Sequence, residues 1–214
     1  MNWGYIMAKR VEGRSDKLLE CAKAEFLEMG FQEASLRVIA AKADTSTGAI
    51  YTRFGDKDGL FHALVDEPVN ELISWIEEGQ QEFSMKPENE QKENVFSYKP
   101  EVWEQLVEYL YEHWDVFRLL VRCSDINCYE TMLNRLVDFE VEYTYRFLNS
   151  TSNDALKTGK LTPMLIHMLS NAYYSGLFEV VRHEMEKEEA LAYVCQLRRF
   201  FVQGWADLLG LRPE

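Results

Sequence analysis

Apolar side chains recur at helical spacing along most of the chain, and short polar or glycine-containing breaks separate the periodic segments. Gly30 stands where the first periodic segment should end, and Ser35 and Asp56 stand where two later helices should be capped at their N-termini. The N-terminal pattern therefore predicts four helices, over Ser15–Met29, Leu36–Ala43, Thr47–Phe54 and Lys57 to about Phe83.

The rest of the chain continues the helical pattern around two polar stretches. We expect Ser84–Tyr98 to be a loop and Asn149–Lys160 to be a flexible link, because both lack apolar periodicity. Further helices are predicted over Pro100–Tyr111, Trp114–Ser124, Asn127–Leu148, Thr162–Arg182 and Lys187–Leu209. With only 11 glycines and 5 prolines in 214 residues, the chain has too few turn-forming residues for a β-sandwich, so the fold class is predicted to be all-α.

Charge is distributed unevenly along the chain. Residues 1–62 hold 9 Lys and Arg against 9 Asp and Glu, whereas residues 63–214 hold 14 against 27 and carry the whole net charge of −13. A protein this acidic is not expected to coat nucleic acid non-specifically, because it repels phosphate. The split indicates two parts with different roles: after a flexible N-terminal arm over residues 1–13, we expect one domain over 14–62 and a second over 63–214.

Nothing in the sequence suggests export or membrane insertion. The chain has no apolar run near the ~18–20 residues that span a bilayer, and its N-terminus lacks the apolar core of a signal peptide. We therefore expect a cytoplasmic protein without membrane contact. The 4 cysteines form no CxxC pair, so reduced thiols are expected, with redox sensing by Cys123 and Cys128 as the alternative.

The segment from Gly30 to Phe61 carries the most specific pattern. It reads GFQEASLRVIAAKADTSTGAIYTRFGDKDGLF and resembles the DNA-binding domain of the TetR family of bacterial transcriptional repressors, whose pattern is similar to G-(F/Y)-x-x-(A/T)-(S/T)-x-x-x-I-A-x-x-A-G-V-(S/T)-x-G-x-(L/I/V)-Y-x-x-F-x-x-K-x-x-L. Upstream, Arg14 and Phe26 also fit the family's first helix. The resemblance implies an N-terminal three-helix, helix-turn-helix DNA-binding domain and a variable helical domain that dimerises and binds a small-molecule inducer.

Two positions depart from that pattern. Asp44 replaces the usual glycine and Thr45 the usual valine at the turn between the two short helices. Aspartate tolerates a left-handed backbone, so the fold should survive, but a carboxylate near DNA should make binding modest and strongly salt-dependent. Lys9, Arg10 and Arg14 in the N-terminal arm are the cations that would compensate by reaching a groove or the phosphate backbone.

The expected DNA contacts lie around the second short helix. Hydroxyl groups at its start can reach base edges or phosphates, and Gly48 lets the backbone approach DNA closely. Tyr51, one turn later, is expected to donate its hydroxyl to a phosphate, although it could instead pack in the core. By resemblance, the candidate base readers are Thr47, Ala49, Thr52 and Arg53. Ala49 would contact a thymine methyl group, and Arg53 would read guanine.

Further candidates flank that helix. The free N–H groups of the helix that Ser35 caps would form a phosphate site, and Lys57 would add a cation on the flanking strand. Arg37 and Lys42 could equally be solvated charges or DNA contacts. The complete candidate DNA-binding set is Ser35, Arg37, Thr45, Ser46, Thr47, Gly48, Ala49, Tyr51, Thr52, Arg53 and Lys57.

The last two predicted helices are the expected homodimer interface. The helix over about 162–182 is apolar nearly all round, which in a soluble protein requires burial on several sides. Ala172 and Gly176 lie four residues apart and would allow another helix to approach closely. We therefore expect this helix and the one over 187–209 to join two copies of the chain, with a purely intramolecular core as the alternative.

Aromatic residues in the C-terminal part could line a ligand pocket, although most could also be ordinary core. Glu140 falls in a gap of an apolar stripe, and a carboxylate there must be paired or solvated. We expect it to bind a cationic or hydroxylated ligand; the alternative is pairing with Arg118 or Arg122, or a bend that exposes it. His167 and Asn171 form a second polar pair. The candidate ligand-binding set is Trp75, Trp103, Phe117, Phe139, Glu140, Tyr143, His167, Asn171 and Tyr173.

Enzyme motifs are missing from the sequence. It contains no GxSxG, P-loop, HExxH or dinucleotide-binding fingerprint, and we predict no catalytic residue, metal or cofactor. The expected function is that of a regulator, most simply a repressor that a small-molecule inducer releases from a pseudo-palindromic double-stranded DNA operator. An activator would use the same residues. The alternative is a dimeric ligand-binding or interaction module whose DNA binding is weak or lost.

Overall fold

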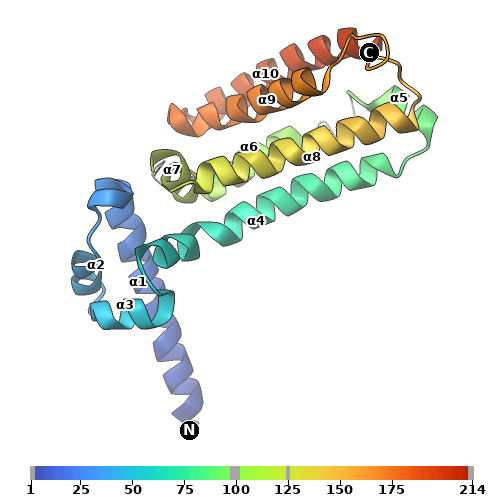
Figure 1. Cartoon of the computed structure of the whole chain (residues 1–214). Coiled ribbons are helices and arrows are strands. Elements are labelled where there is room, and N and C mark those ends of the chain that lie inside the picture. Colours follow the sequence, from blue (N-terminus) through green and yellow to red (C-terminus); the bar gives the residue numbers. More distant parts are fainter. Residues whose placement is uncertain (1–2, 97–101, 124–125, 212–214) are drawn as a thin grey trace. The chain divides into compact units, whose positions relative to one another are not determined.

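The computed structural model describes the backbone of residues 3–96, 102–123 and 126–211, and the side chains of those ranges from Lys17 onward except Val102. These ranges contain helices and no strand, which confirms the predicted all-α class (Figure 1). The helices are α1 (Trp3–Glu33), α2 (Leu36–Lys42), α3 (Thr47–Phe54), α4 (Lys57–Ser84), α5 (Glu88–Asn94), α6 (Val102–Glu112), α7 (Trp114–Arg122), α8 (Cys128–Ser150), α9 (Pro163–Arg182) and α10 (Lys187–Leu209). Within this described part, no helix combines the length and the hydropathy that crossing a membrane requires.

The helices form two compact units. The N-terminal unit comprises Met1–Val69 and His113–Tyr129, and the C-terminal unit comprises Asn70–Glu112 and Glu130–Glu214. The chain therefore passes from one unit to the other within α4, between α6 and α7, and within α8. This division differs from the predicted boundary after residue 62, because α7 packs on α1 and Phe117 is buried in the N-terminal unit.

Helix α1 organises the core of the N-terminal unit. Its Phe26 ring stacks on Phe31 with 5.7 Å between centroids and meets Phe61 of α4 edge to face at 5.4 Å. All three rings are buried, as are Ile39 of α2 and Ile50 of α3. Because burial of one such side chain contributes roughly 1.5–3 kcal/mol, this core fixes the positions of the two short helices.

The ends of α1 agree only in part with the predicted helix. The helical run breaks at Gly30, whose φ of 74° and ψ of 173° lie outside the helical region, and this confirms the predicted stop. The predicted start at Ser15 is wrong, because the helix begins at Trp3 and residues 3–13 are helical rather than a loose arm. Helix-favouring residues such as Met7 and Ala8 outweigh the glycines there, each of which costs only about 1 kcal/mol.

In the C-terminal unit, α10 packs against α6 and α9. Gly176 allows the close approach of α9 and α10, since a Cβ atom there would lie 3.1 Å from Leu197 Cδ2. The Tyr193 hydroxyl also donates to the Gly176 carbonyl at 2.9 Å. The expected close approach at Gly176 is therefore present, but it joins two helices of one chain.

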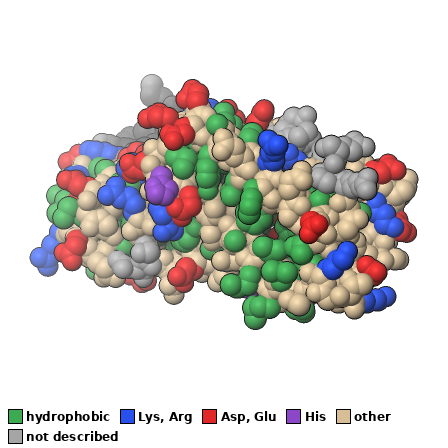
Figure 2. Space-filling view, turned by 90° about the horizontal axis from the view of Figure 1, so that it is seen from above, with side chains coloured by type: hydrophobic (Ala, Val, Ile, Leu, Met, Phe, Trp, Pro, Cys, Tyr) green, Lys and Arg blue, Asp and Glu red, His purple; other side chains and the backbone are tan. Residues whose placement is uncertain are grey.

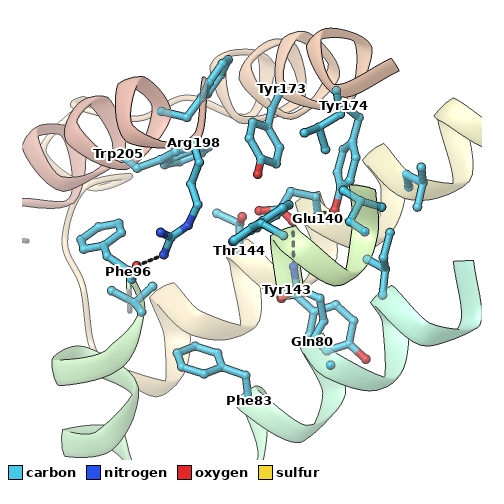
Figure 3. Close-up of a pocket in the computed structure, with 18 of the residues that line it drawn as sticks. Gln80, Phe83, Phe96, Glu140, Tyr143, Thr144, Tyr173, Tyr174, Arg198 and Trp205 are labelled. Carbon is cyan, nitrogen blue, oxygen red and sulfur yellow. Dashed lines mark hydrogen bonds between the residues drawn. The ribbon is translucent and has the colours of Figure 1, made fainter. Parts of the chain in front are cut away.

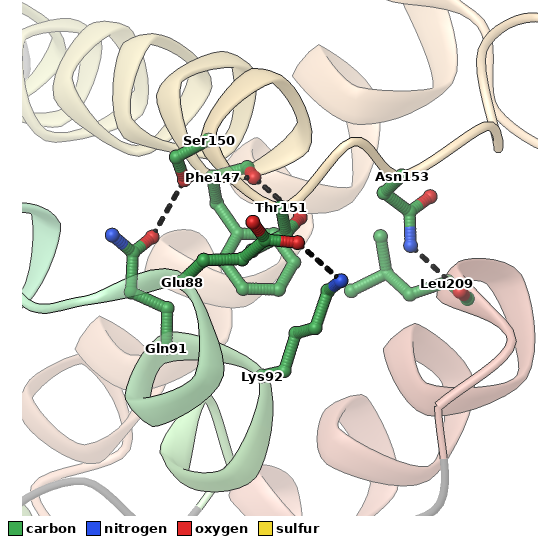
Figure 4. A network of polar contacts seen from close by, with 8 residues as sticks. All are labelled: Glu88, Gln91, Lys92, Phe147, Ser150, Thr151, Asn153 and Leu209. Carbon is green, nitrogen blue, oxygen red and sulfur yellow. Dashed lines mark hydrogen bonds and ion pairs between the residues drawn. The ribbon is translucent and has the colours of Figure 1, made fainter.

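The segment expected to be a loop from Ser84 to Tyr98 contains α5. The Gln91 side chain is buried, and its Nε2 donates to the carbonyl oxygens of Ser84 at 3.2 Å and Lys86 at 2.7 Å. Its Oε1 accepts a hydrogen bond from the Ser150 hydroxyl at 2.8 Å, at the end of α8 (Figure 4). A buried amide satisfied in this way holds α5 in place, and the polar composition of the segment does not reveal it.

The flexible link expected over residues 149–160 is also wrong. After α8 ends, the chain makes a series of turns in which Thr151 and Ala155 are buried. Asn153 fixes these turns to the end of α10, because its Nδ2 donates to the Leu209 carbonyl at 2.9 Å (Figure 4). Side-chain hydrogen bonds therefore order a segment whose composition is typical of loops.

Candidate nucleic-acid interface and ligand cavity

Helix α3 presents a polar surface to solvent and anchors itself through one apolar side chain. Ile50 is completely buried. The exposed residues of the helix are Gly48, Ala49, Tyr51, Thr52 and Arg53, whereas Thr47 is half-buried. Because Tyr51 is 55% exposed, the alternative that it packs in the core is wrong. Most of the expected base and phosphate contacts thus share one accessible surface.

Hydrogen bonds orient two hydroxyl groups of this surface, one at the residue before α3 and one in its second turn. Ser46 caps the helix, since its Oγ accepts the N–H of Ala49 at 3.2 Å and keeps its own proton available. The Thr52 hydroxyl donates to the Gly48 carbonyl at 2.8 Å, which leaves its lone pairs available as acceptors. Arg53 extends its guanidinium over the half-buried Phe54 ring, 5.2 Å from the centroid. The surface is therefore ordered before any partner binds.

Asp44 closes the turn between α2 and α3. Its φ of 51° lies in the left-handed region, as expected where the resembled pattern has glycine. Lys17 of α1 forms an ion pair with its carboxylate, which lowers the pKa of Asp44 and raises that of Lys17. The negative charge expected near DNA is thus offset by a cation from α1. The side chains of the other compensating candidates, Lys9, Arg10 and Arg14, lie outside the described residues.

Ser35 precedes α2 as expected, but its hydroxyl makes no capping hydrogen bond, so the predicted side-chain cap is wrong. The carboxylate of Glu25, which is buried on α1, accepts the Ser35 N–H at 3.4 Å and Lys42 Nζ at 2.9 Å. The Glu25 carboxylate also raises the pKa of Lys42. One buried acid therefore joins both ends of α2 to α1 and gives Lys42 a structural partner. Arg37 is exposed.

Lys57, expected to contact a phosphate, is engaged within the N-terminal unit. Its Nζ donates to the carbonyl oxygens of Gln32 at 2.9 Å and Ala34 at 3.2 Å. The ammonium also lies 4.7 Å from the centroid of the Phe31 ring. These contacts occupy two of its three N–H donors, so only one is left for the DNA contact that we predict.

The C-terminal unit contains a cavity of about 380 Å³. Side chains of α4, α5, α6, α8, α9 and α10 line it, and most of them are aromatic or aliphatic (Figure 3). Small-molecule sites typically measure roughly 300–1,000 Å³, so this volume suits a compact ligand. The polar side chains that interrupt the apolar lining include Gln80, Glu140, Thr144, Tyr173, Tyr174 and Arg198.

Glu140 of α8 brings a carboxylate into this lining. Its Oε2 accepts a hydrogen bond from Gln80 Nε2 of α4 at 2.8 Å and another from the Tyr174 hydroxyl of α9 at 3.2 Å. The alternative pairing with Arg118 or Arg122 is wrong, since the partners of the carboxylate are Gln80 and Tyr174. Burial raises the pKa of Glu140, although the two hydrogen bonds act in the opposite direction.

Tyr173 of α9 adds a second polar group beside this carboxylate. Its ring packs edge to face against Trp103 at 5.5 Å and Phe201 at 5.0 Å between centroids. Its hydroxyl is buried without a hydrogen-bond partner among the described residues, and Figure 3 shows it pointing into the cavity. Burial and the nearby charge of Glu140 raise the pKa of Tyr173 well above its ordinary value, so the hydroxyl keeps its proton.

The structure brings together part of the predicted ligand-binding set. The predicted residues that line the cavity are Trp75, Trp103, Glu140, Tyr143 and Tyr173. The other four do not line it: Phe117 is buried in the N-terminal unit, His167 is exposed, and Phe139 and Asn171 are half-buried. Helical spacing identifies the apolar face of a helix but not what that face meets, which explains these four errors.

Sequence reasoning missed Gln80, Tyr174 and Arg198. Arg198 Nη2 donates to the Phe96 carbonyl at 2.5 Å, so its guanidinium is held at the lining (Figure 3). Tyr174 carried a usable signal, because it places a polar group in a strongly apolar helix, whereas Arg198 lies among other charged residues of α10. Gln80 carried none, since it lies in a polar stretch of α4 and matters only through its contact with Glu140.

Comparison with known sequences supports the N-terminal motif. Residues 18–64 match the family model described as "Bacterial regulatory proteins, tetR family". Two relatives, both named HTH-type transcriptional repressor AcnR, come from Corynebacterium efficiens and Corynebacterium glutamicum. They are 36% identical over 70 and 62 residues, which cover 33% and 29% of this chain. The matches span 37% and 33% of the relatives, so the chain covers about a third of their length.

Solved structures extend the likeness to the whole fold. A regulator assigned to the TetR family from Syntrophomonas wolfei matches with a TM-score of 0.60 and 19% identity, over 90% of this chain and 96% of that one. A TetR-like transcriptional regulator from Rhodococcus sp. RHA1 matches with a TM-score of 0.54 and 20% identity, over 92% and 96%. Residues 18–64 thus carry the motif of the TetR family of bacterial regulatory proteins, and the chain as a whole shares the helical fold of these solved regulators.

Proposed function

We propose that this chain is a DNA-binding transcriptional regulator, and that it is a repressor which a small molecule releases from its operator. The exposed face of α3 carries the proposal, because Ala49, Thr52 and Arg53 surround Tyr51 while Ile50 anchors the helix. A helix held in this way can enter the major groove, where arginine reads guanine and a methyl group reads thymine. We infer that the protein acts in the cytoplasm.

We infer that two copies join through α9 and α10. Met164 and Met168 of α9 are 69% and 57% exposed, and Phe200 of α10 is 74% exposed. Figure 2 shows hydrophobic side chains gathered on the face where these two helices lie. Exposed apolar groups of this size favour a protein interface. A two-fold dimer would read half-sites about 34–36 Å apart, so the operator is expected to be pseudo-palindromic.

The effector would bind in the cavity of the C-terminal unit. Gln80 of α4 and Glu140 of α8 meet there, and both helices continue into the N-terminal unit. A ligand that prefers the DNA-incompetent arrangement of these helices would weaken DNA binding, with a coupling free energy of about 1–3 kcal/mol. A ligand with equal affinity for both arrangements would change nothing.

The test is selection of binding sites by the purified full-length protein from random DNA fragments, followed by fluorescence anisotropy. Arg53→Ala should weaken binding to the selected site about 5- to 150-fold, the effect of roughly 1–3 kcal/mol for one guanine contact. Lys157→Ala is the matched control, since it removes an exposed cation of the C-terminal unit, and its affinity should stay unchanged.

Selection of one palindromic sequence supports the proposal. If no sequence is enriched even at low salt, the regulator hypothesis is wrong and the module with lost DNA binding is favoured. If Lys157→Ala weakens binding as much as Arg53→Ala, α3 is not the reading helix. A promoter–reporter assay then separates a repressor from an activator, because only a repressor raises expression when it is deleted.

A further inference from the structure

We propose that the cavity of the C-terminal unit binds a hydrophobic organic cation, with Glu140 as its counterion. The ligand class is a molecule with an aromatic or alkyl body and one protonated or quaternary ammonium group. The inference rests on the proposed function only in taking this cavity as the effector site; the choice of ligand class comes from the charges and rings that line it.

The carboxylate of Glu140 lacks a cationic partner. Both of its hydrogen bonds, from Gln80 and Tyr174, reach Oε2, and neither donor carries a charge. Among the described residues, no ion pair to Glu140 is present, and Oε1 accepts no hydrogen bond. Placing a carboxylate in an apolar lining without a counterion costs free energy. A ligand with a positive charge would supply the counterion that the protein itself does not provide.

The cation that lines the cavity is not placed to neutralise Glu140. Among the described residues of the lining, that cation is the guanidinium of Arg198. Arg198 is held by its bond to the Phe96 carbonyl, and Figure 3 shows it directed towards Phe96 rather than towards Glu140. The resident cation therefore leaves Glu140 uncompensated.

Aromatic rings supply the rest of the site. Trp75, Trp103, Tyr143 and Trp205 line the same cavity as Glu140. Rings attract cations to their negatively charged faces, and cages of such rings are a recurrent means of binding quaternary ammonium groups. A carboxylate combined with several rings suits an organic cation better than a small hydrated ion, which keeps its water.

The buried Tyr173 hydroxyl is an independent sign that the site is made for a ligand. A buried polar group without a hydrogen bond is uncommon in native proteins, and this one points into the cavity beside Glu140 (Figure 3). Both of its lone pairs and its proton are available to a bound molecule. A hydroxyl oxygen next to a carboxylate extends the negative surface that a cation would meet.

The experiment compares isosteric probes on the purified full-length protein without DNA. Tryptophan fluorescence reports binding, since Trp75, Trp103 and Trp205 line the cavity. The probes are trimethyl(4-phenylbutyl)ammonium, its neutral analogue with a tert-butyl group in place of the ammonium, and 5-phenylpentanoate. We expect the cation to bind at least tenfold more tightly than either of the others.

Glu140→Gln should abolish most of this preference while leaving the affinity for the neutral analogue unchanged. The variant keeps an oxygen that accepts the bonds from Gln80 and Tyr174, so it should fold. Glu142→Gln is the control: it removes a neighbouring carboxylate of the same helix that is exposed, paired with Arg146 and outside the lining. Equal or weaker binding of the cation by the parent, or an unchanged preference in Glu140→Gln, overturns the inference.

The outcomes separate this inference from the proposed function. A cation preference that depends on Glu140 supports the ligand class even if the protein selects no DNA. Conversely, if the protein selects an operator but the neutral or anionic probe binds as tightly as the cation, the ligand class is wrong and the regulator proposal stands. Because the preference is first measured in the parent protein, a folding defect in one variant leaves the test intact.

Discussion

Replacing Tyr173 with phenylalanine should stabilise the C-terminal unit. The substitution removes one oxygen atom and leaves the ring in its contacts with Trp103 and Phe201. That oxygen is buried without a hydrogen-bond partner among the described residues, so the protein around it offers no bond in place of those made to water in the unfolded chain. An unsatisfied buried hydroxyl costs about 1–3 kcal/mol, and phenylalanine avoids this loss.

The neighbouring residue provides a matched control of opposite sign. Tyr174→Phe also removes one buried hydroxyl from α9, but this hydroxyl donates to Glu140 at 3.2 Å. Its loss leaves the carboxylate with Gln80 as its remaining hydrogen-bond donor among the described residues, and should destabilise the fold by about 1 kcal/mol or more. Two substitutions of identical chemistry at adjacent positions are thus expected to shift stability in opposite directions.

Urea unfolding followed by tryptophan fluorescence measures both effects at one protein concentration, since the proposed dimerisation would make the midpoint concentration-dependent. For an m-value of about 3 kcal/mol/M, a gain of about 1.5 kcal/mol raises the midpoint of Tyr173→Phe by about 0.5 M. A lower midpoint for Tyr173→Phe would refute the reasoning, because it would mean that the hydroxyl has a partner in solution. A shift of both variants in the same direction would refute it equally.

Three further predictions concern backbone packing, pH and the DNA-facing turn. Gly59→Ala should destabilise the N-terminal unit by about 1–3 kcal/mol in thermal melts, because a Cβ atom would lie 1.9 Å from the Phe54 carbonyl oxygen; an unchanged melting temperature would show that this contact relaxes freely. Burial raises the pKa of Glu140 in the folded protein above its ordinary value of 4.5. Protonated Glu140 therefore contributes fully to the stability of the fold below pH 4.5, and this contribution is lost as the pH rises through the raised pKa. Glu140→Gln should therefore gain stability over the parent as the pH rises from 4 to 8, and a constant difference would contradict the raised pKa. Lys17→Ala should weaken operator binding severalfold by exposing the charge of Asp44, but should have little effect in an Asp44→Gly background; equal losses in both backgrounds would mean that the ion pair does not matter for binding.

The N-terminal motif could be predicted closely because its determinants are local. The stop at Gly30, the cap at Asp56 and the left-handed turn at Asp44 each depend on a few neighbouring residues. Side-chain partners across the unit could not be predicted, since they depend on packing. Lys57 and Ser35 are the examples. Lys57 donates to carbonyl groups of the chain, and the Ser35 hydroxyl makes no capping bond while its N–H donates to a buried acid ten residues earlier.

The cavity shows the same limit at longer range. Glu140 could be singled out because it interrupts an apolar stripe within one helix. Its partner Gln80 lies 60 residues away in sequence and comes next to it only when α4 and α8 pack. Phe117 lies on the apolar face of its helix, as a pocket residue would. It is nevertheless buried in the core of the N-terminal unit, because α7 packs on α1. Periodicity reports that a residue is buried, and tertiary packing decides where.

The connection between the two units gives the proposed effector site a route to α3, the proposed DNA-reading helix. Glu140 and Gln80 lie on α8 and α4, and each of these helices runs without interruption from one unit into the other. Only two residues, Gly55 and Asp56, separate α3 from α4, and α4 contains Pro68 next to the point where the chain changes unit. Proline removes a backbone hydrogen bond, which makes this the point where α4 bends most easily. Under our proposal, a cation that competes with Gln80 for Glu140 would therefore act on the helix that follows α3 in the chain.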